Sequence, residues 1–291
     1  MVNRLVIVGV GLIGGSLALA LRKAGFSAEI IGVGRSSANL ELAKRLKIID
    51  RIENRASDAV RSADLVVLAV PVAVIRSVLE EIGPFLPASA VVTDVGSVKS
   101  GVMTDAKKIL GESVSRFIPG HPIAGSDEKG AESSFAGLFL NHYVLLTPSK
   151  ETDPKALALV EDMWVATGAH VALLNESKHD HNLAFTSHLP HILSYSLMNV
   201  IEKKGGVGEF VGMMGGGFRD TTRIASSDPE IWTDIILANR DEILHACSLY
   251  KEQLAEFLDA LIERDESRIF RFIERAKKAR DDCIIPDAND D

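Results

Sequence analysis

The sequence contains few cysteines and no excess of positive charge. Only two of its 291 residues, Cys247 and Cys283, are cysteines, which supply neither a disulfide framework nor the ligand spacing of a zinc site. The formal net charge is −8, without the basic footprint of a protein that binds nucleic acid or an anionic membrane. These absences predict a cytoplasmic protein with no nucleic-acid partner and no membrane partner.

Long apolar runs are also scarce. The one exception, residues 5–21, has the length of a signal peptide or a short membrane segment. It contains four glycines, however, and no convincing small-residue cleavage site follows it, so we interpret it as part of the fold. Hydrophobic residues make up 46% of the chain, which excludes a mainly disordered protein.

Up to about residue 174, short β-branched runs alternate with longer helical stretches, the pattern of an α/β fold. Strands are expected at residues 5–8, 29–33, 65–69, 91–93, 116–118, 143–146 and 170–174. Helices are expected between them at residues 14–24, 39–46, 72–82, 101–110 and 154–167. Strands this apolar need helices on both faces, which predicts a doubly wound, Rossmann-type parallel sheet.

From residue 175 the strand-like runs stop and helical periodicity takes over. One apolar stripe at spacings of three and four residues consists of Ile243, Leu244, Cys247, Leu254, Leu258 and Leu261. The sequence therefore predicts an α/β domain at residues 1–174 and an all-α domain at residues 175–291. The stripe, in so short a helical domain, is consistent with a homodimer.

A glycine-rich turn, Gly9-Val10-Gly11-Leu12-Ile13-Gly14, follows the first strand and opens the first helix. Gly9 permits the tight turn, Gly11 lets a pyrophosphate approach the backbone, and Gly14 allows close packing of helix on strand. The free N–H groups of the helix N-terminus would then meet the phosphates. The expected cofactor-binding residues of the α/β domain are Gly9, Gly11, Leu12, Ile13, Gly14, Arg35, Ser36, Val70 and Pro71.

The end of the second strand bears on the choice between NAD and NADP. A site for NAD usually has an acidic residue there that bonds the ribose hydroxyls, but this sequence reads Gly34-Arg35-Ser36. Arg35 and Ser36 could hold a 2′-phosphate, which favours NADP. Alternatively, Arg35 stacks on the adenine or points to solvent, and NAD remains acceptable.

Two polar segments follow strands at the sheet edge where open α/β folds bind ligands, Asp94–Lys99 and Gly120–Asp127. His121 therefore lies where a nicotinamide ring is expected. Oxidation of an alcohol needs a base of near-neutral pKa, which a histidine provides, and Ser97 could orient the same hydroxyl. The alternative is that His121 is a structural histidine of a loop.

The helical half contains a second polar concentration. Four histidines lie within thirteen residues: His179, His181, His188 and His191. Their spacing matches no standard zinc motif, so no metal is expected. Arg219 and Arg223 stand four residues apart on one predicted helical face and could clamp a carboxylate substrate. They could equally pair with Asp220 and Asp228 on a solvated surface, and spacing alone does not decide.

Five separated motifs carry a resemblance to a known family: GVGLIGGS at 9–16, DVGSVK at 94–99, GHPIAGS at 120–126, SHLPH at 187–191 and GGGFRDTTRIASSDPEIW at 215–232. Together they resemble the prephenate/arogenate (cyclohexadienyl) dehydrogenases of tyrosine biosynthesis, from residue 1 to roughly residue 280. The resemblance implies an enzyme that oxidises the ring alcohol of prephenate or arogenate with loss of CO2 and hydride transfer to NAD or NADP. It also implies a helical domain that forms a homodimer.

The resemblance further implies roles for individual residues. His121 would accept the hydrogen bond of the ring hydroxyl, Ser97 would assist, and Arg223 would bind a substrate carboxylate. Asp127 matches a position that is often glutamate and has been seen as a gate. The implied substrate-binding residues are Ser126, Asp127, His188, His191, Arg219, Arg223 and Trp232.

Two other functions fit parts of this pattern. One is a two-domain dehydrogenase that acts on a β-hydroxy acid or reduces an imine. The other is a redox sensor that binds the nucleotide without catalysis, which binding without turnover of any cyclohexadienyl substrate would favour. The sequence does not distinguish prephenate from arogenate, which differ by a keto or an amino group on the side chain.

Overall fold

The structure is a computed structural model that describes residues 2–125 and 128–283. It divides into two compact units, one extending to Arg240 and one beginning at Asp241, and each is described by itself. The change in sequence character near residue 174 lies inside the first unit. Within the described residues, no helix is both long enough and apolar enough to span a bilayer.

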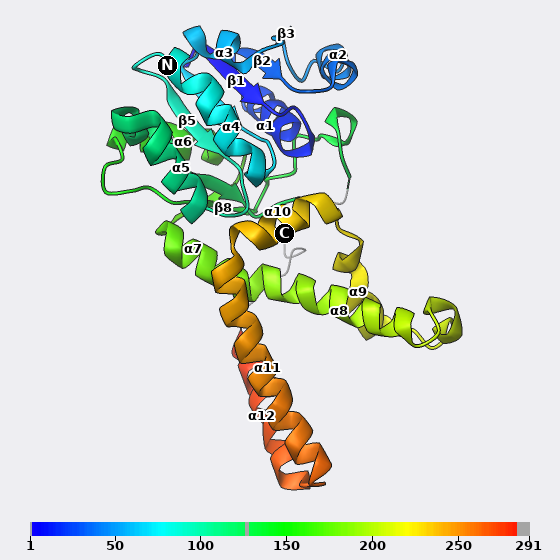
Figure 1. Ribbon diagram of the computed structural model, residues 1–291. Coiled ribbons are helices and arrows are strands. Elements are labelled where there is room, and N and C mark those ends of the chain that lie inside the picture. The colour runs from blue at the N-terminus through cyan, green and yellow to red at the C-terminus, as the bar shows by residue number, and fades with distance from the viewer. Residues whose placement is uncertain (1, 126–127, 284–291) are drawn as a thin grey trace. The chain divides into compact units, whose positions relative to one another are not determined.

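The first unit is built on a six-stranded sheet in which every neighbouring pair of strands is parallel (Figure 1). Its strands, in spatial order, are β3 (Arg51–Ile52), β2 (Glu29–Val33), β1 (Arg4–Val8), β4 (Leu65–Leu68), β5 (Val91–Asp94) and β6 (Phe117–Ile118). Leu5 of β1 pairs with Ile30 on one side and with Leu65 on the other. This arrangement confirms the predicted doubly wound sheet.

Helices cover both faces of this sheet because successive strand residues point to opposite sides. Leu5 and Ile7 belong to one apolar cluster, together with Leu17 of the first helix, whereas Val6 and Val8 belong to a second cluster. The helices of this part are α1 (Leu12–Lys23), α2 (Ser37–Arg45), α3 (Ala56–Ala59), α4 (Val72–Ile82), α5 (Ser100–Leu110) and α6 (Pro154–Ala166). All five predicted helices are present, with ends within two residues of the expected ones.

A second, three-stranded sheet contains two of the strands predicted for the first. Its order is β7 (Gly120–Pro122), β8 (Tyr143–Leu146) and β9 (His170–Leu173), with β7 antiparallel to β8 and β8 parallel to β9. Only Pro119 separates β6 from β7, so the chain changes sheets there. His121 consequently lies in the middle of a strand, paired with Leu145, and not in the loop that the sequence predicted.

The first unit continues as helices, as the periodicity predicted. They are α7 (Glu176–Leu183), a π-helical turn (Ala184–His188), α8 (Leu189–Lys203), α9 (Gly216–Thr222) and α10 (Pro229–Ala238). The side chain of Asn175 caps α7 by accepting a hydrogen bond from the N–H of Lys178 at 2.7 Å. The side chain of Asp228 caps α10, ahead of a proline in its first turn.

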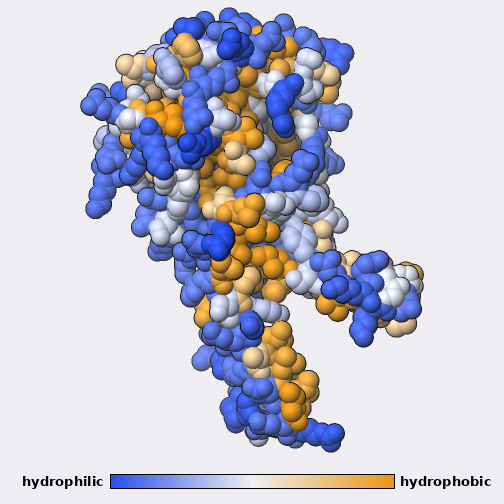
Figure 2. Space-filling view, in the orientation of Figure 1, coloured by the Kyte–Doolittle hydropathy of each residue, from blue (hydrophilic) through white to orange (hydrophobic). Residues whose placement is uncertain are grey.

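The second unit contains the long helix α11 (Arg240–Ile262), apart from its first residue, and helix α12 (Glu266–Asp281). Phe257 and Phe272 pack with ring centroids 5.4 Å apart, and Arg275 pairs with Glu256 at 3.2 Å. Much of the predicted apolar stripe nevertheless remains exposed, with Leu261 at 52%. Figure 2 shows apolar side chains gathered along this pair of helices.

Candidate active site

A cavity of about 840 Å³ lies at the carboxyl ends of β1, β2 and β4. Six of the predicted cofactor-binding residues line it: Gly9, Gly11, Arg35, Ser36, Val70 and Pro71. The other three, Leu12, Ile13 and Gly14, form the first turn of α1. The first intrahelical hydrogen bond after that turn runs from the N–H of Gly15 to the carbonyl of Gly11, so the N–H groups of the turn have no acceptor inside the helix.

The three glycines of the turn have different roles. Gly9 has a φ of 101°, and a Cβ there would lie 2.2 Å from the carbonyl oxygen of Ala69. A Cβ on Gly14 would lie 2.2 Å from the carbonyl oxygen of Gly9, whereas a Cβ on Gly11 would meet nothing within 4 Å. The fold therefore requires two of the glycines, and Gly11 leaves open space at the cavity. Free helix N–H groups beside open space fit the pyrophosphate of a dinucleotide.

The far end of the cavity is basic. Arg35 and Arg55 both line it and are exposed, and neither has an ion-pair partner in the described part of the chain. The hydroxyl of Ser36 accepts a hydrogen bond from the N–H of Asn39 at 3.2 Å and so begins α2. Arg55 could not be predicted from the sequence, because no pattern there indicates that the turn after β3 reaches this cavity.

Asn39 is another residue that the sequence analysis missed. Its Nδ2 donates to the carbonyl of Val10 at 2.7 Å, and its Oδ1 accepts from the N–H of Ala131 at 2.9 Å. The side chain therefore ties the glycine-rich turn to a segment more than ninety residues later. No local pattern in the sequence signals such a contact.

A buried ion pair organises the loop after β5. The ammonium group of Lys99 contacts the carboxylate of Asp94, and both side chains are fully buried. Lys99 also donates to the carbonyl of Gly120 at 2.7 Å, directly before His121. Burial lowers the pKa of Lys99, and the contact with Asp94 opposes that shift. Ser97 lies half-buried in the same loop.

His121 meets the helical part of the unit at His179 of α7. Its Nδ1 lies 2.9 Å from Nε2 of His179, and the ring centroids are 5.1 Å apart. Burial lowers the pKa of His121 well below its ordinary value of 6.5, and nearby His179 and Lys99 lower it further. His121 is consequently a neutral imidazole at neutral pH, which is the form that can accept a proton.

His188 is held in the same region by the π-helical turn and by α10. Its Nδ1 lies 3.1 Å from Nδ2 of Asn239, which also donates to the carbonyl of Asp180 at 2.8 Å. Burial lowers the pKa of His188 to about 4, although the charge of Asp180 acts in the opposite direction. The sequence analysis identified His188 and missed Asn239, which follows α10 and lies 51 residues further along the chain.

Trp232 of α10 packs against both histidines of the SHLPH motif. Its ring stacks on His191 with centroids 3.5 Å apart, and it lies edge-on to His188 at 6.0 Å. Nδ1 of His191 lies 2.9 Å from the carbonyl oxygen of Ser187. These contacts bring together three of the predicted substrate-binding residues.

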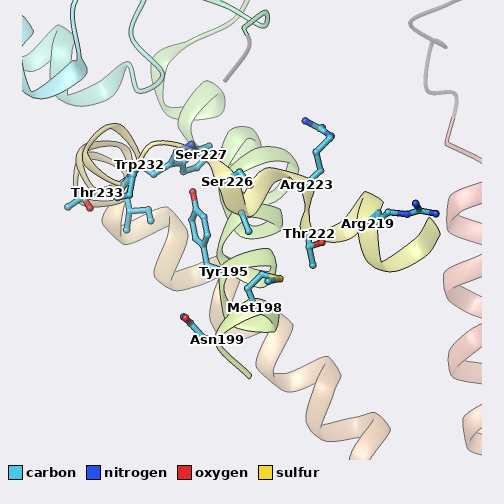
Figure 3. Close-up of a pocket in the computed structure, with 13 residues that line it drawn as sticks. Tyr195, Met198, Asn199, Arg219, Thr222, Arg223, Ser226, Ser227, Trp232 and Thr233 are labelled. Atoms are coloured by element: carbon cyan, nitrogen blue, oxygen red, sulfur yellow. The ribbon is translucent and has the colours of Figure 1, made fainter. Parts of the chain in front are cut away.

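On its other side Trp232 lines a second cavity, of about 770 Å³, together with Arg219 and Arg223 (Figure 3). Arg219 lies in the middle of α9, which ends at Thr222, and Arg223 begins the 3₁₀ turn that follows it. Their guanidinium groups point in different directions in Figure 3, so the two do not form the single helical face that their spacing suggested. Neither has an ion-pair partner among the described residues.

The alternative that these arginines pair with Asp228 on the surface is not found among the described residues. The Asp228 carboxylate accepts hydrogen bonds from the N–H groups of Glu230 and Ile231 and pairs with the ammonium group of Lys129. Ser126 and Asp127, which the sequence analysis also assigned to the substrate, lie outside the described residues. Among the described residues, no group of three or more histidine, cysteine and acidic side chains could hold a metal ion.

Comparison with known families gives two adjoining matches. Residues 17–173 match the nucleotide-binding domain of prephenate dehydrogenase, and residues 175–275 match the dimerization domain of prephenate dehydrogenase.

Individual relatives match over nearly the whole chain. The cyclohexadienyl dehydrogenase of Zymomonas mobilis is 34% identical over 96% of this chain and 95% of its own length. The crystal structure of prephenate dehydrogenase from Aquifex aeolicus, in complex with hydroxyphenyl propionate and NAD+, is 34% identical with a TM-score of 0.88 and covers 96% of this chain and 97% of its own. The Synechocystis arogenate dehydrogenase structure is 30% identical with a TM-score of 0.82, at 96% and 99% coverage.

Proposed function

The chain belongs to the prephenate dehydrogenase family, and we propose that it carries out the family's reaction at the site around His121. The reaction is the oxidative decarboxylation of prephenate or arogenate, with hydride transfer to NAD(P). The observation that supports the assignment is the position of His121 in β7, where its Nδ1 lies 2.9 Å from Nε2 of His179 and its surroundings lower its pKa well below 6.5. A neutral imidazole there can take a hydroxyl proton without first losing one of its own.

His121 acts as the proton acceptor in this proposal. The ring hydroxyl of the substrate donates its proton to the imidazole while a hydride leaves the ring carbon. A bound nicotinamide ring supplies the acceptor for that hydride. The substrate ring, now electron-poor, loses its carboxylate as CO2. The electron pair of the broken carbon–carbon bond passes through the ring to the carbonyl oxygen, which takes back the proton held by His121 as the ring becomes aromatic. No separate acid is needed for the second step, so the protein has mainly to position the ring.

Arg223 and Arg219 are proposed to hold the substrate carboxylates. Both line one cavity, and their guanidinium groups lack an ion-pair partner in the described part of the chain. A guanidinium binds a carboxylate with two parallel hydrogen bonds, which gives orientation as well as affinity. Trp232 joins this cavity to His188, so the carboxylate site and the histidine cluster adjoin. Ser97, Ser126, Asp127 and His191 complete the proposed substrate site.

The cavity at the glycine-rich turn is proposed to bind the dinucleotide, with the pyrophosphate at Gly11 and the N-terminus of α1. Arg35, Ser36 and Arg55 line its basic end, where they could bind a 2′-phosphate. We therefore propose a preference for NADP. The turn after β2 has no acidic residue that could bond the ribose hydroxyls, so nothing in it would favour NAD over NADP.

We further propose a nucleotide domain at residues 1–174 and a helical domain at residues 175–291 that forms a homodimer. The match to a dimerization domain and the exposed leucines of α11 support the dimer. Light scattering at micromolar concentration should give the mass of two chains. A cytoplasmic location is proposed from the two free cysteines.

One assay tests the activity. Purified protein is mixed with prephenate or arogenate and with NAD or NADP, in all four combinations, while reduced nicotinamide is followed by absorbance and the aromatic product and CO2 are quantified. We expect turnover in at least one combination, with equal amounts of the three products. Nucleotide binding without turnover in any combination would contradict the proposal and favour a redox sensor.

A further inference from the structure

His121 contacts His179 of α7, and His179 in turn contacts its neighbour Asp180; the proposed reaction uses neither of these two residues directly. Nε2 of His179 lies 2.9 Å from Nδ1 of His121, and Nδ1 of His179 lies 2.8 Å from Oδ1 of Asp180. His179 is fully buried and Asp180 is nearly so, at 4% exposure. The three side chains therefore form a continuous chain of hydrogen bonds that ends at a buried carboxylate.

The Asp180 carboxylate, at the end of this chain of hydrogen bonds, is held in place by backbone N–H groups. Asp180 accepts hydrogen bonds from the backbone N–H groups of Lys99 and Ser100, both at 2.8 Å, at the start of α5. Burial would raise the pKa of Asp180, but the hydrogen bonds from His179, Ser100 and Lys99 outweigh it and hold the pKa below its ordinary value. Asp180 is thus ionised at neutral pH and can only accept hydrogen bonds.

The direction of each remaining bond follows from that charge. Because Asp180 only accepts, Nδ1 of His179 must carry a proton. A neutral His179 then has a lone pair on Nε2, and this lone pair can only accept a proton from Nδ1 of His121. His121 in turn has its own lone pair on Nε2, the ring nitrogen that is not bonded to His179.

We propose that His179 and Asp180 are positioning residues that hold His121 in the tautomer with its proton on Nδ1, so that Nε2 presents a lone pair to the substrate hydroxyl. The inference rests on the proposed role of His121 as proton acceptor. When Nε2 takes the hydroxyl proton, His121 becomes an imidazolium, and the polarised bond to His179 and the Asp180 carboxylate stabilises its charge. The proton itself stays on His121.

Other titratable groups lie near this chain of hydrogen bonds. Lys99 and His188 both face His121, and Asp94 faces Lys99. Lys99 also fixes the carbonyl of Gly120, so the backbone at His121 and the ring are restrained by different contacts.

The tautomer can be read directly in the parent protein. In ¹⁵N-histidine-labelled protein at neutral pH, the His121 resonances, assigned by their loss in His121→Asn, should show a protonated Nδ1 and an unprotonated Nε2. A protonated Nε2 would overturn the inference and leave the proposed function intact. Full activity in His121→Asn would instead overturn the proposed function.

Steady-state kinetics distinguish a positioning role of His179 and Asp180 from a merely structural one. We expect His179→Asn and Asp180→Asn to lower kcat by about 10²- to 10⁴-fold with little change in KM, as in other sites where a carboxylate sets a histidine tautomer. His181→Asn, an exposed histidine of the same helix, is the matched control and should keep the parent kcat. In a His121→Asn background, adding His179→Asn should cause no further loss. A further fall in kcat in the double variant would show that His179 also acts by a route that does not involve His121.

Discussion

Asn239 and His188 form a hydrogen bond of 3.1 Å between Nδ2 of the amide and Nδ1 of the imidazole. Since the same amide group donates to the carbonyl of Asp180, it presents a donor to His188, which must accept through Nδ1 and carry its proton on Nε2. His188 is therefore a hydrogen-bond donor at the site, whereas His121 is proposed to be an acceptor.

The buried neutral state of His188 predicts a pH-dependent stability. Its pKa is about 4 in the folded protein, against about 6.5 in the unfolded chain, so between these values the unfolded chain binds more protons. The free energy of unfolding should fall as the pH drops from 6.5 to 4, by up to roughly 3 kcal/mol from this group. Denaturant unfolding at a series of pH values measures it. If the free energy of unfolding of His188→Asn fell with pH as steeply as that of the parent, the prediction would be contradicted.

The pH profile of turnover should reflect His121. The base must be unprotonated, and burial holds its pKa well below 6.5, so protonation removes activity only at lower pH. We expect kcat to stay constant as the pH is lowered through 6.5 and to fall only at pH values well below 6.5. Steady-state kinetics at saturating substrate give the profile. A loss of kcat centred at or above 6.5 would mean that His121 is not the group that titrates.

Arg223 should contribute mainly to substrate binding. Removing a guanidinium that holds a carboxylate in the ground state and the transition state alike should raise KM by about ten- to a hundredfold in Arg223→Ala, with a smaller effect on kcat. Arg61→Ala, an exposed arginine that pairs with Asp58, serves as the control. An unchanged KM in Arg223→Ala would exclude Arg223 from the carboxylate site.

Arg35 should affect the choice of cofactor. It lines the basic end of the dinucleotide cavity and has no ion-pair partner among the described residues. In Arg35→Ala we expect the Kd for NADP to rise about ten- to a hundredfold, while the Kd for NAD changes little. Arg45→Ala, at the other end of α2, controls for the loss of charge. A parent protein that prefers NAD, with a Kd ratio unaffected by Arg35→Ala, would contradict the preference for NADP.

The parts of the fold that could be predicted are those with a strong local signal. The apolar strands and the glycine-rich turn appeared where the sequence placed them, since burial on both faces and a tight turn restrict the residue types. The short strands β3 and β7 were missed because two or three residues carry no periodicity. The separate pairing of β8 and β9 was missed for a related reason, since a strand's own residues do not specify its neighbour.

The site was predictable only in part, for a similar reason. His121, Arg223 and Gly11 could be predicted because their residue types suit proton acceptance, carboxylate binding and the approach of a pyrophosphate, respectively. Asp180 and Asn239 act through contacts with residues dozens of positions away, and each could equally be a solvated polar residue of a helix or a helix end. The π-helical turn at Ala184–His188 likewise had no recognisable signal in the sequence.

The central claim, that His121 is the proton acceptor, is tested most directly by the steady-state kinetics of His121→Asn. His142→Asn, an exposed histidine before β8, is the control for the substitution itself. Loss of a general base predicts that kcat falls by about 10²- to 10⁴-fold, with little change in the KM for prephenate or arogenate. A kcat in His121→Asn close to that of the parent and of His142→Asn would contradict the account.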